Sequence, residues 1–148
     1  MSRSELIPAI NADSFGDVVK KVRLLEPLAS RFAFSYIHID VADGTFTKNS
    51  IWHEPKDLVG FETDLSIEVH LMISDIDTRI NDWLFDPIRR VIFHLEAAHD
   101  PEIVIKKCRE AGREVGFAVR PDTPVEDLKP WCGKIDLICI LRVPPGAS

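Results

Sequence analysis

Three side chains in two β-branched runs of the chain are of the types that bind divalent metal ions. His38 and Asp40 stand two residues apart in one run, and His70 stands in the next. Because alternate residues of a strand share a face, His38 and Asp40 would point the same way, and His70 could join them from a neighbouring strand. Imidazole nitrogens and carboxylate oxygens suit a divalent cation. The alternative is that the histidines are hydrogen-bonded residues of the core.

Other polar side chains collect near the carboxyl ends of the same runs. Glu68 would lie one layer deeper, either as a paired buried carboxylate or as a partner that orients a ligand histidine. His94 and Glu96 are expected beside the ligands or toward a substrate, and not as direct ligands. Ligand sites of α/β barrels and of open parallel sheets both lie at this end. The residues expected there are Asn11, His38, Asp40, His70, His94, Glu96 and Arg120.

A parallel sheet would bring these residues together at one of its edges. The sequence has the alternation of strands and helices that predicts such a sheet. Short β-branched runs recur with centres roughly 22 to 31 residues apart, which is the period of a βα unit. Runs that alternate with helices predict a parallel sheet, either open and doubly wound or closed as a barrel. The runs are 6–10, 35–41, 65–73, 90–95, 114–119 and 137–143.

Start and stop signals of helices lie between the runs. Ser14 precedes an apolar rhythm and has Asp17 at the capping-box position. Ser74 is expected to cap a helix that carries Ile76, Ile80 and Trp83. Further helices are predicted for 101–112, for 55–59 and from Pro124 onward.

Composition and charge exclude several classes of protein. At 148 residues, 45% apolar and 28% charged, the chain is ordinary globular material of one domain or most of one. A net charge of -6 argues against nucleic acid as the main partner. Apolar runs all fall short of the ~18 residues that span a bilayer, so no membrane partner is expected. Three cysteines without CxxC spacing indicate free thiols in a reducing cytoplasm. The turn after the first run lacks a glycine-rich phosphate-binding motif, which argues against a nucleotide-binding fold.

Several short motifs follow one another along the chain in a characteristic order. They are HIDVADG at 38–44 followed by Phe46 and Asn49, EVHLM at 68–72, HLEA at 94–97, PDTP at 121–124 and PG at 145–146. In this combination the chain resembles the ribulose-phosphate 3-epimerase family over essentially its whole length. The opening IPAI at 7–10 and the tryptophan at Trp52 resemble a divergent bacterial or archaeal branch.

The resemblance implies a fold, a cofactor and a reaction. The fold would be a (β/α)8 TIM barrel, and His38, Asp40 and His70 would bind one divalent ion of zinc, iron, manganese or cobalt. The reaction would interconvert ribulose 5-phosphate and xylulose 5-phosphate, in the pentose phosphate pathway, by moving the C3 proton through an enediolate. Asp40 would also be one acid–base catalyst, and a second aspartate after the seventh strand would work from the opposite face. The substrate phosphate would bind backbone N–H groups beginning near Gly146.

Departures from the family pattern concern the substrate side. Met72 keeps one of the usual methionines, whereas Ala42 and Leu141 replace two others. Asn11 stands where a substrate-binding serine is usual, and Arg120 stands where asparagine is usual. We therefore expect Asn11, Met72, Arg120 and Gly146 to contact substrate, with an epimerase for another ketose phosphate as the alternative. The related decarboxylase and hexulose-phosphate synthase group carries Asp-x-Lys at a strand end, whereas the matching stretch here is Asp40-Val41-Ala42, without a lysine.

The chain is shorter than a complete eight-unit barrel. Eight units at the observed spacing would need roughly 200 residues, against 148 here. We expect residues 1–148 to form a single incomplete barrel domain of six βα units that lacks strands seven and eight. We expect this C-terminally truncated chain to be inactive alone, and the full-length protein to be a cytoplasmic homo-oligomer that acts on a sugar phosphate. A non-catalytic incomplete barrel is the other possibility.

Overall fold

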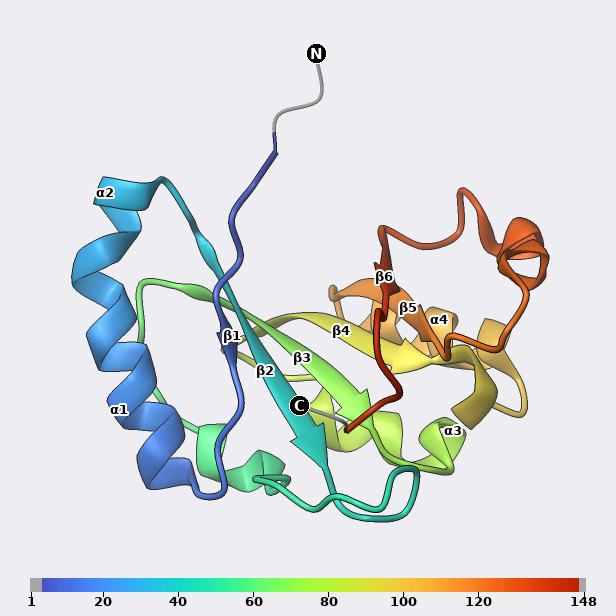
Figure 1. Ribbon diagram of the computed structural model, residues 1–148, viewed down its shortest axis with the longest axis horizontal. Helices are drawn as coiled ribbons and strands as arrows, with labels where there is room; N and C mark the ends of the chain where they lie inside the picture. The colour runs from blue at the N-terminus through green and yellow to red at the C-terminus, as the bar shows by residue number, and fades with distance from the viewer. Residues whose placement is uncertain (1–3, 147–148) are drawn as a thin grey trace.

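Six parallel strands form one curled sheet in the computed structural model, which describes residues 4–146. The strands lie side by side in the order of the sequence, from β1 to β6 (Figure 1). Each predicted run overlaps one of them, and β5 coincides with its predicted range. Their bounds are Ala9–Ile10 (β1), Tyr36–Ala42 (β2), Ser66–Met72 (β3), Ile88–His94 (β4), Glu114–Val119 (β5) and Leu137–Ile140 (β6).

The register of the sheet separates an apolar face from a polar one. On β2, Ile37, Ile39 and Val41 are almost completely buried in the core that joins the sheet to its helices. The alternate residues His38 and Asp40 point to the inner, concave side, as the period of two requires. In neighbouring strands Asp40 pairs with His70, and His38 pairs with Glu68. The polar side chains of successive strands therefore form rows across the inner face.

A register shift separates β3 from β4. Ile67 pairs with Ile88, whereas the next residue, Glu68, pairs with Arg90. Arg89 is thus an extra residue of β4, as in a β-bulge. Because of it, Ile88 stays in the apolar core while Arg90, two residues later, joins the row of inward-facing side chains.

Two helices follow their predicted capping signals. Helix α1, Phe15–Leu25, begins after Ser14, whose hydroxyl accepts a hydrogen bond from the backbone N–H of Asp17. Its buried residues Val18 and Val22 face the sheet. Helix α4, Pro101–Glu110, is capped by Asp100 and is followed by Gly112 at a φ of +70°. Figure 1 shows α1 beside β1 and β2, and α4 near β5.

Elsewhere the helices are shorter than predicted. Ser74 does not cap the helix after β3, because the helix begins one residue later and Asp75 takes the cap position. The backbone N–H of Ser74 donates to the hydroxyl of Thr45 in another loop. The predicted helices at 55–59 and after Pro124 are both 3-10 helices, and Pro130 lies inside the second of these. The remaining short elements are η1 (Glu26–Leu28), α2 (Ala29–Phe32), η2 (Pro55–Leu58), α3 (Ile76–Arg79), η3 (Ile80–Trp83), η4 (Leu95–Ala97) and η5 (Val125–Trp131).

The arrangement is that of a partial (β/α)8 barrel, with neighbouring strands joined through helices or helical turns outside a curled parallel sheet. Across residues 4–146, every helix is too short or too polar to cross a membrane.

Candidate metal and active site

The structure brings His38, Asp40 and His70 together on the inner face of β2 and β3. One potential ligand atom from each of them lies within 4.8 Å of the other two. Asp40 Oδ1 is 3.1 Å from His38 Nε2 and 3.0 Å from His70 Nδ1. Two nitrogens and a carboxylate therefore converge on one point, as a divalent cation requires.

The electrostatics of this cluster match a site that binds a cation. Burial alone would raise the pKa of Asp40, but hydrogen bonds from His38 and His70 outweigh it and hold that pKa well below its usual range. Burial would likewise lower the pKa of His38, yet its bonds to Asp40 and Glu68 raise it to about 9. Without a metal, the carboxylate is thus neutralised by a proton on His38. A divalent ion could take the place of that proton.

Glu68 supports His38 from the deeper layer of the sheet. The His38 Nδ1–H donates to Glu68 Oε1 at 2.7 Å, and Glu68 is only 3% exposed. This contact directs the other ring nitrogen, Nε2, toward Asp40. The second oxygen of Glu68 forms an ion pair with Arg90, so Glu68 is a paired buried carboxylate as well as a neighbour of His38.

His94 and Glu96 continue the chain of contacts behind His70. His70 Nε2 lies 3.0 Å from His94 Nε2, and His94 Nδ1 lies 3.3 Å from a carboxylate oxygen of Glu96. Burial, followed by the electrostatic influence of the neighbouring His70 ring, lowers the pKa of His94 to about 4, so His94 is neutral near pH 7. A consistent assignment has His94 donating to Glu96 and accepting from His70 Nε2–H, which leaves His70 Nδ1 for a ligand.

A cavity of about 200 Å³ opens beside the cluster. Asn11, Met72 and Gly146, three of the residues predicted to contact substrate, line it together with the three candidate ligands. Cys139 and Leu141 of the last strand region complete much of its apolar wall. Asp40, which is 23% exposed at its side chain, is accessible from this cavity.

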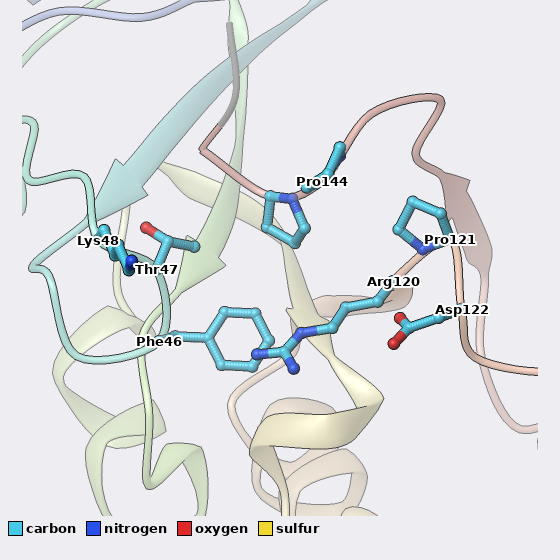
Figure 2. Close-up of a pocket in the computed structure, with 8 residues that line it drawn as sticks. Phe46, Thr47, Lys48, Arg120, Pro121, Asp122 and Pro144 are labelled. Atoms are coloured by element: carbon cyan, nitrogen blue, oxygen red, sulfur yellow. The ribbon is translucent and has the colours of Figure 1, made fainter.

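Arg120, the fourth residue predicted to contact substrate, lines a different pocket. This neighbouring pocket has a volume of about 430 Å³ and shares Pro144 and Pro145 with the cavity. In it the Arg120 guanidinium lies 4.5 Å from the centre of the Phe46 ring (Figure 2). Lys48 stands on the opposite wall.

Sequence reasoning missed two features of the site. Phe46 was only part of a motif, but its ring packs 4.6 Å from that of His94 as well as against Arg120. Arg90 had no assigned role, yet it contacts Glu68. The pair Arg89 and Arg90 within a strand was the available signal, but the sequence alone does not tell which of the two faces inward.

A partial barrel of parallel βα units, with a histidine–aspartate cluster at the carboxyl ends of its strands, defines a class of barrel proteins that can hold a metal ion beside a small-molecule cavity. Comparison with known proteins narrows this class. Residues 6–148 match the ribulose-phosphate 3 epimerase family, and the chain belongs to that family.

Its relatives include proteins named ribulose-phosphate 3-epimerase from distant organisms. The Rhodobacter capsulatus protein is 27% identical over 144 residues, which cover 96% of this chain and 61% of that protein. The Schizosaccharomyces pombe protein is 27% identical, covering 99% and 64%. The Treponema pallidum protein is 30% identical, covering 100% and 67%. The chain thus spans roughly three fifths to two thirds of the length of these relatives.

Proposed function

We propose that this chain supplies the metal ligands and one acid–base group of an epimerase that interconverts ribulose 5-phosphate and xylulose 5-phosphate. The observation that carries the proposal is the convergence of His38, Asp40 and His70 beside a cavity. Family membership supports the reaction, and the histidine and carboxylate donors fit one ion of zinc, iron, manganese or cobalt. Relatives named for this activity support a sugar phosphate as the substrate.

The chemistry asks for the removal of a weakly acidic proton at C3, next to the C2 carbonyl. A divalent ion held by the three ligands would supply Lewis-acid stabilisation of the oxygens at C2 and C3. Asp40 would take the proton, because its lowered pKa keeps the carboxylate ionised. Both histidines bond to its Oδ1, so Oδ2 is free of hydrogen bonds within residues 4–146 and is the oxygen that can accept the proton.

Residues around the cavity would bind and orient the sugar. Asn11 offers an amide to the hydroxyls, Met72 covers the ring of ligands, and the backbone of Gly146 would begin the phosphate site. Glu68, His94 and Glu96 would hold the two ligand histidines in place. All three cysteines are free thiols, which favours a cytoplasmic location. Assembly into a homo-oligomer remains part of the proposal for the full-length protein.

A second candidate substrate is a longer ketose phosphate. The pocket between Phe46 and Arg120 adjoins the cavity through Pro144 and Pro145, and it would accommodate a further hydroxymethylene group. The Arg120→Asn variant distinguishes the two candidates. If Arg120 selects a ketohexose phosphate, the variant loses kcat/KM for that substrate and retains it for ribulose 5-phosphate.

The proposal is tested by hydrogen exchange at C3 in the full-length gene product. Ribulose 5-phosphate is incubated with the protein in deuterium oxide, and loss of the C3 proton signal is followed by NMR. We expect exchange that stops after treatment with a chelator and returns when zinc or manganese is added. Exchange that is insensitive to complete metal removal would refute the metal-dependent mechanism.

A further inference from the structure

A row of four charged or ionisable side chains crosses the inner face one layer below Asp40 and His70. His38 pairs in register with Glu68, Glu68 with Arg90, and Arg90 with Glu114, on four consecutive strands. The parallel register therefore stacks these side chains as direct neighbours. His38 is the member of the row that also belongs to the metal cluster.

Glu68 links the ligand histidine to an arginine through its two oxygens. Oε1 accepts from His38 Nδ1 at 2.7 Å, and Oε2 accepts from Arg90 Nη1 at 2.7 Å. The side chain of Glu68 is only 4% exposed, so water cannot replace either partner easily. A carboxylate buried to this degree needs both contacts to stay ionised and fixed.

Arg90 is itself held on three sides. Its Nε donates to Glu114 Oε2 at 2.6 Å, and its guanidinium lies 4.3 Å from the centre of the Tyr36 ring. Its side chain is 15% exposed. The extra residue Arg89 in β4 is what turns Arg90 inward to meet Glu68. The β-bulge in β4 thus lies next to Arg90, the residue that brings a positive charge into this row.

We propose that Arg90 is a positioning residue of the metal centre. By fixing Glu68, it holds the His38 ring in the orientation that presents Nε2 to Asp40 and the bound ion. Glu114 and Tyr36 keep the guanidinium in place. The inference rests on the proposed metal-binding function of His38, and it predicts an effect on metal affinity from a residue that touches neither metal nor substrate. Loss of such supporting contacts typically lowers metal affinity about 10- to 100-fold.

The test compares Arg90→Met and Arg90→Lys with a matched control, Arg113→Met. Arg113 is an equally shielded arginine, 12% exposed, whose guanidinium pairs with Asp86 at 2.7 Å and, within residues 4–146, forms no hydrogen bond with a side chain of the row. Zinc affinity of the full chain is measured by competition with a chromogenic chelator. In metal-free protein, NMR of the histidine rings reports whether the Nδ1 proton of His38 is still held in its hydrogen bond.

We expect Arg90→Met to weaken zinc binding about 10- to 100-fold and to expose the His38 Nδ1 proton to exchange. Arg90→Lys should recover part of both effects, and Arg113→Met should leave both at the parent level. Parent-like affinity and a parent-like His38 signal in Arg90→Met would overturn the inference. If Arg90→Met does not fold, zinc affinity and the His38 signal are measured in Arg90→Lys and Glu114→Gln, and parent-like values in both would overturn the inference. If the parent binds no zinc, the proposed metal centre is wrong. The NMR comparison of the metal-free proteins would then still show whether Arg90 holds the His38 ring in its hydrogen bond.

Discussion

Replacing Asp40 by asparagine separates its chemical role from its structural one. The amide has nearly the shape of the carboxylate, and its oxygen can still accept hydrogen bonds from His38 and His70 at the present 3.1 and 3.0 Å. What disappears is the negative charge and the ability to accept a proton. We therefore expect a small loss of stability together with a large loss of C3 proton exchange.

The structure allows both magnitudes to be worked out. Two hydrogen bonds change from charged to neutral, and since each change costs roughly 1 kcal/mol, the metal-free variant should lose about 2 kcal/mol of unfolding free energy. Removal of a general base slows proton transfer by about 100- to 10,000-fold, which is about 2.7 to 5.5 kcal/mol of activation free energy. Loss of a charged ligand to the ion adds to the effect on rate.

The assay is C3 proton exchange in deuterium oxide by the full-length gene product, with urea denaturation measured in parallel. Asp43→Asn is the matched control. Asp43 lies just after the same strand, is 9% exposed at its side chain and pairs with Arg79 at 2.6 Å, away from the ligands. The control should lose stability and keep its exchange rate. Exchange by Asp40→Asn within tenfold of the parent, or an equal loss in the control, would refute the reasoning.

Three further outcomes follow from the packing and the charges. Phe93→Ala should lower the unfolding free energy in urea by about 3–5 kcal/mol, because Phe93 is fully buried and packs edge-on against Phe117; a loss below 1 kcal/mol would contradict this packing. Burial raises the pKa of Cys108 to about 12, so a thiol reagent at pH 8 should modify exposed Cys132 rapidly and Cys108 only after unfolding. Burial opposes ionisation of Asp136, but bonds from Arg109 and a backbone N–H outweigh it and lower its pKa. The stability this group contributes is present above its unfolded pKa and lost on acidification, so Asp136→Asn should cost about 1 kcal/mol or less at pH 7 and nothing near pH 2; an equal cost at both pH values would exclude this linkage.

Periodicity in the sequence predicts the sheet and the convergence of the candidate ligands. The two-residue spacing of His38 and Asp40 fixes their common face, and parallel pairing of consecutive strands then aligns Asp40 with His70. Both statements need only alternation and strand order. The cap at Ser14 and the helix after Asp100 were predictable because their signals act within a few residues.

Contacts that depend on irregular backbone were not predictable in this way. Arg89 and Arg90 are adjacent and chemically equivalent, and only the bulge in β4 decides that Arg90 faces the row. The position of Arg120 depends on the loop that carries Phe46, so alternation along β5 could not show that the two side chains stack. Ser74 is not the cap because the chain enters the helix one residue later, at Asp75 with a φ of +55°.

The central claim is that His38, Asp40 and His70 bind one divalent ion, and its most direct test is the metal content of the purified protein. Elemental analysis after loading with zinc and removal of unbound metal should give one ion per chain for the parent. The His70→Ala variant should retain less than a tenth of that amount, while the surface variant His99→Ala, whose ring is 85% exposed, should match the parent. Undiminished metal in His70→Ala, or no bound metal in the parent, would contradict the account.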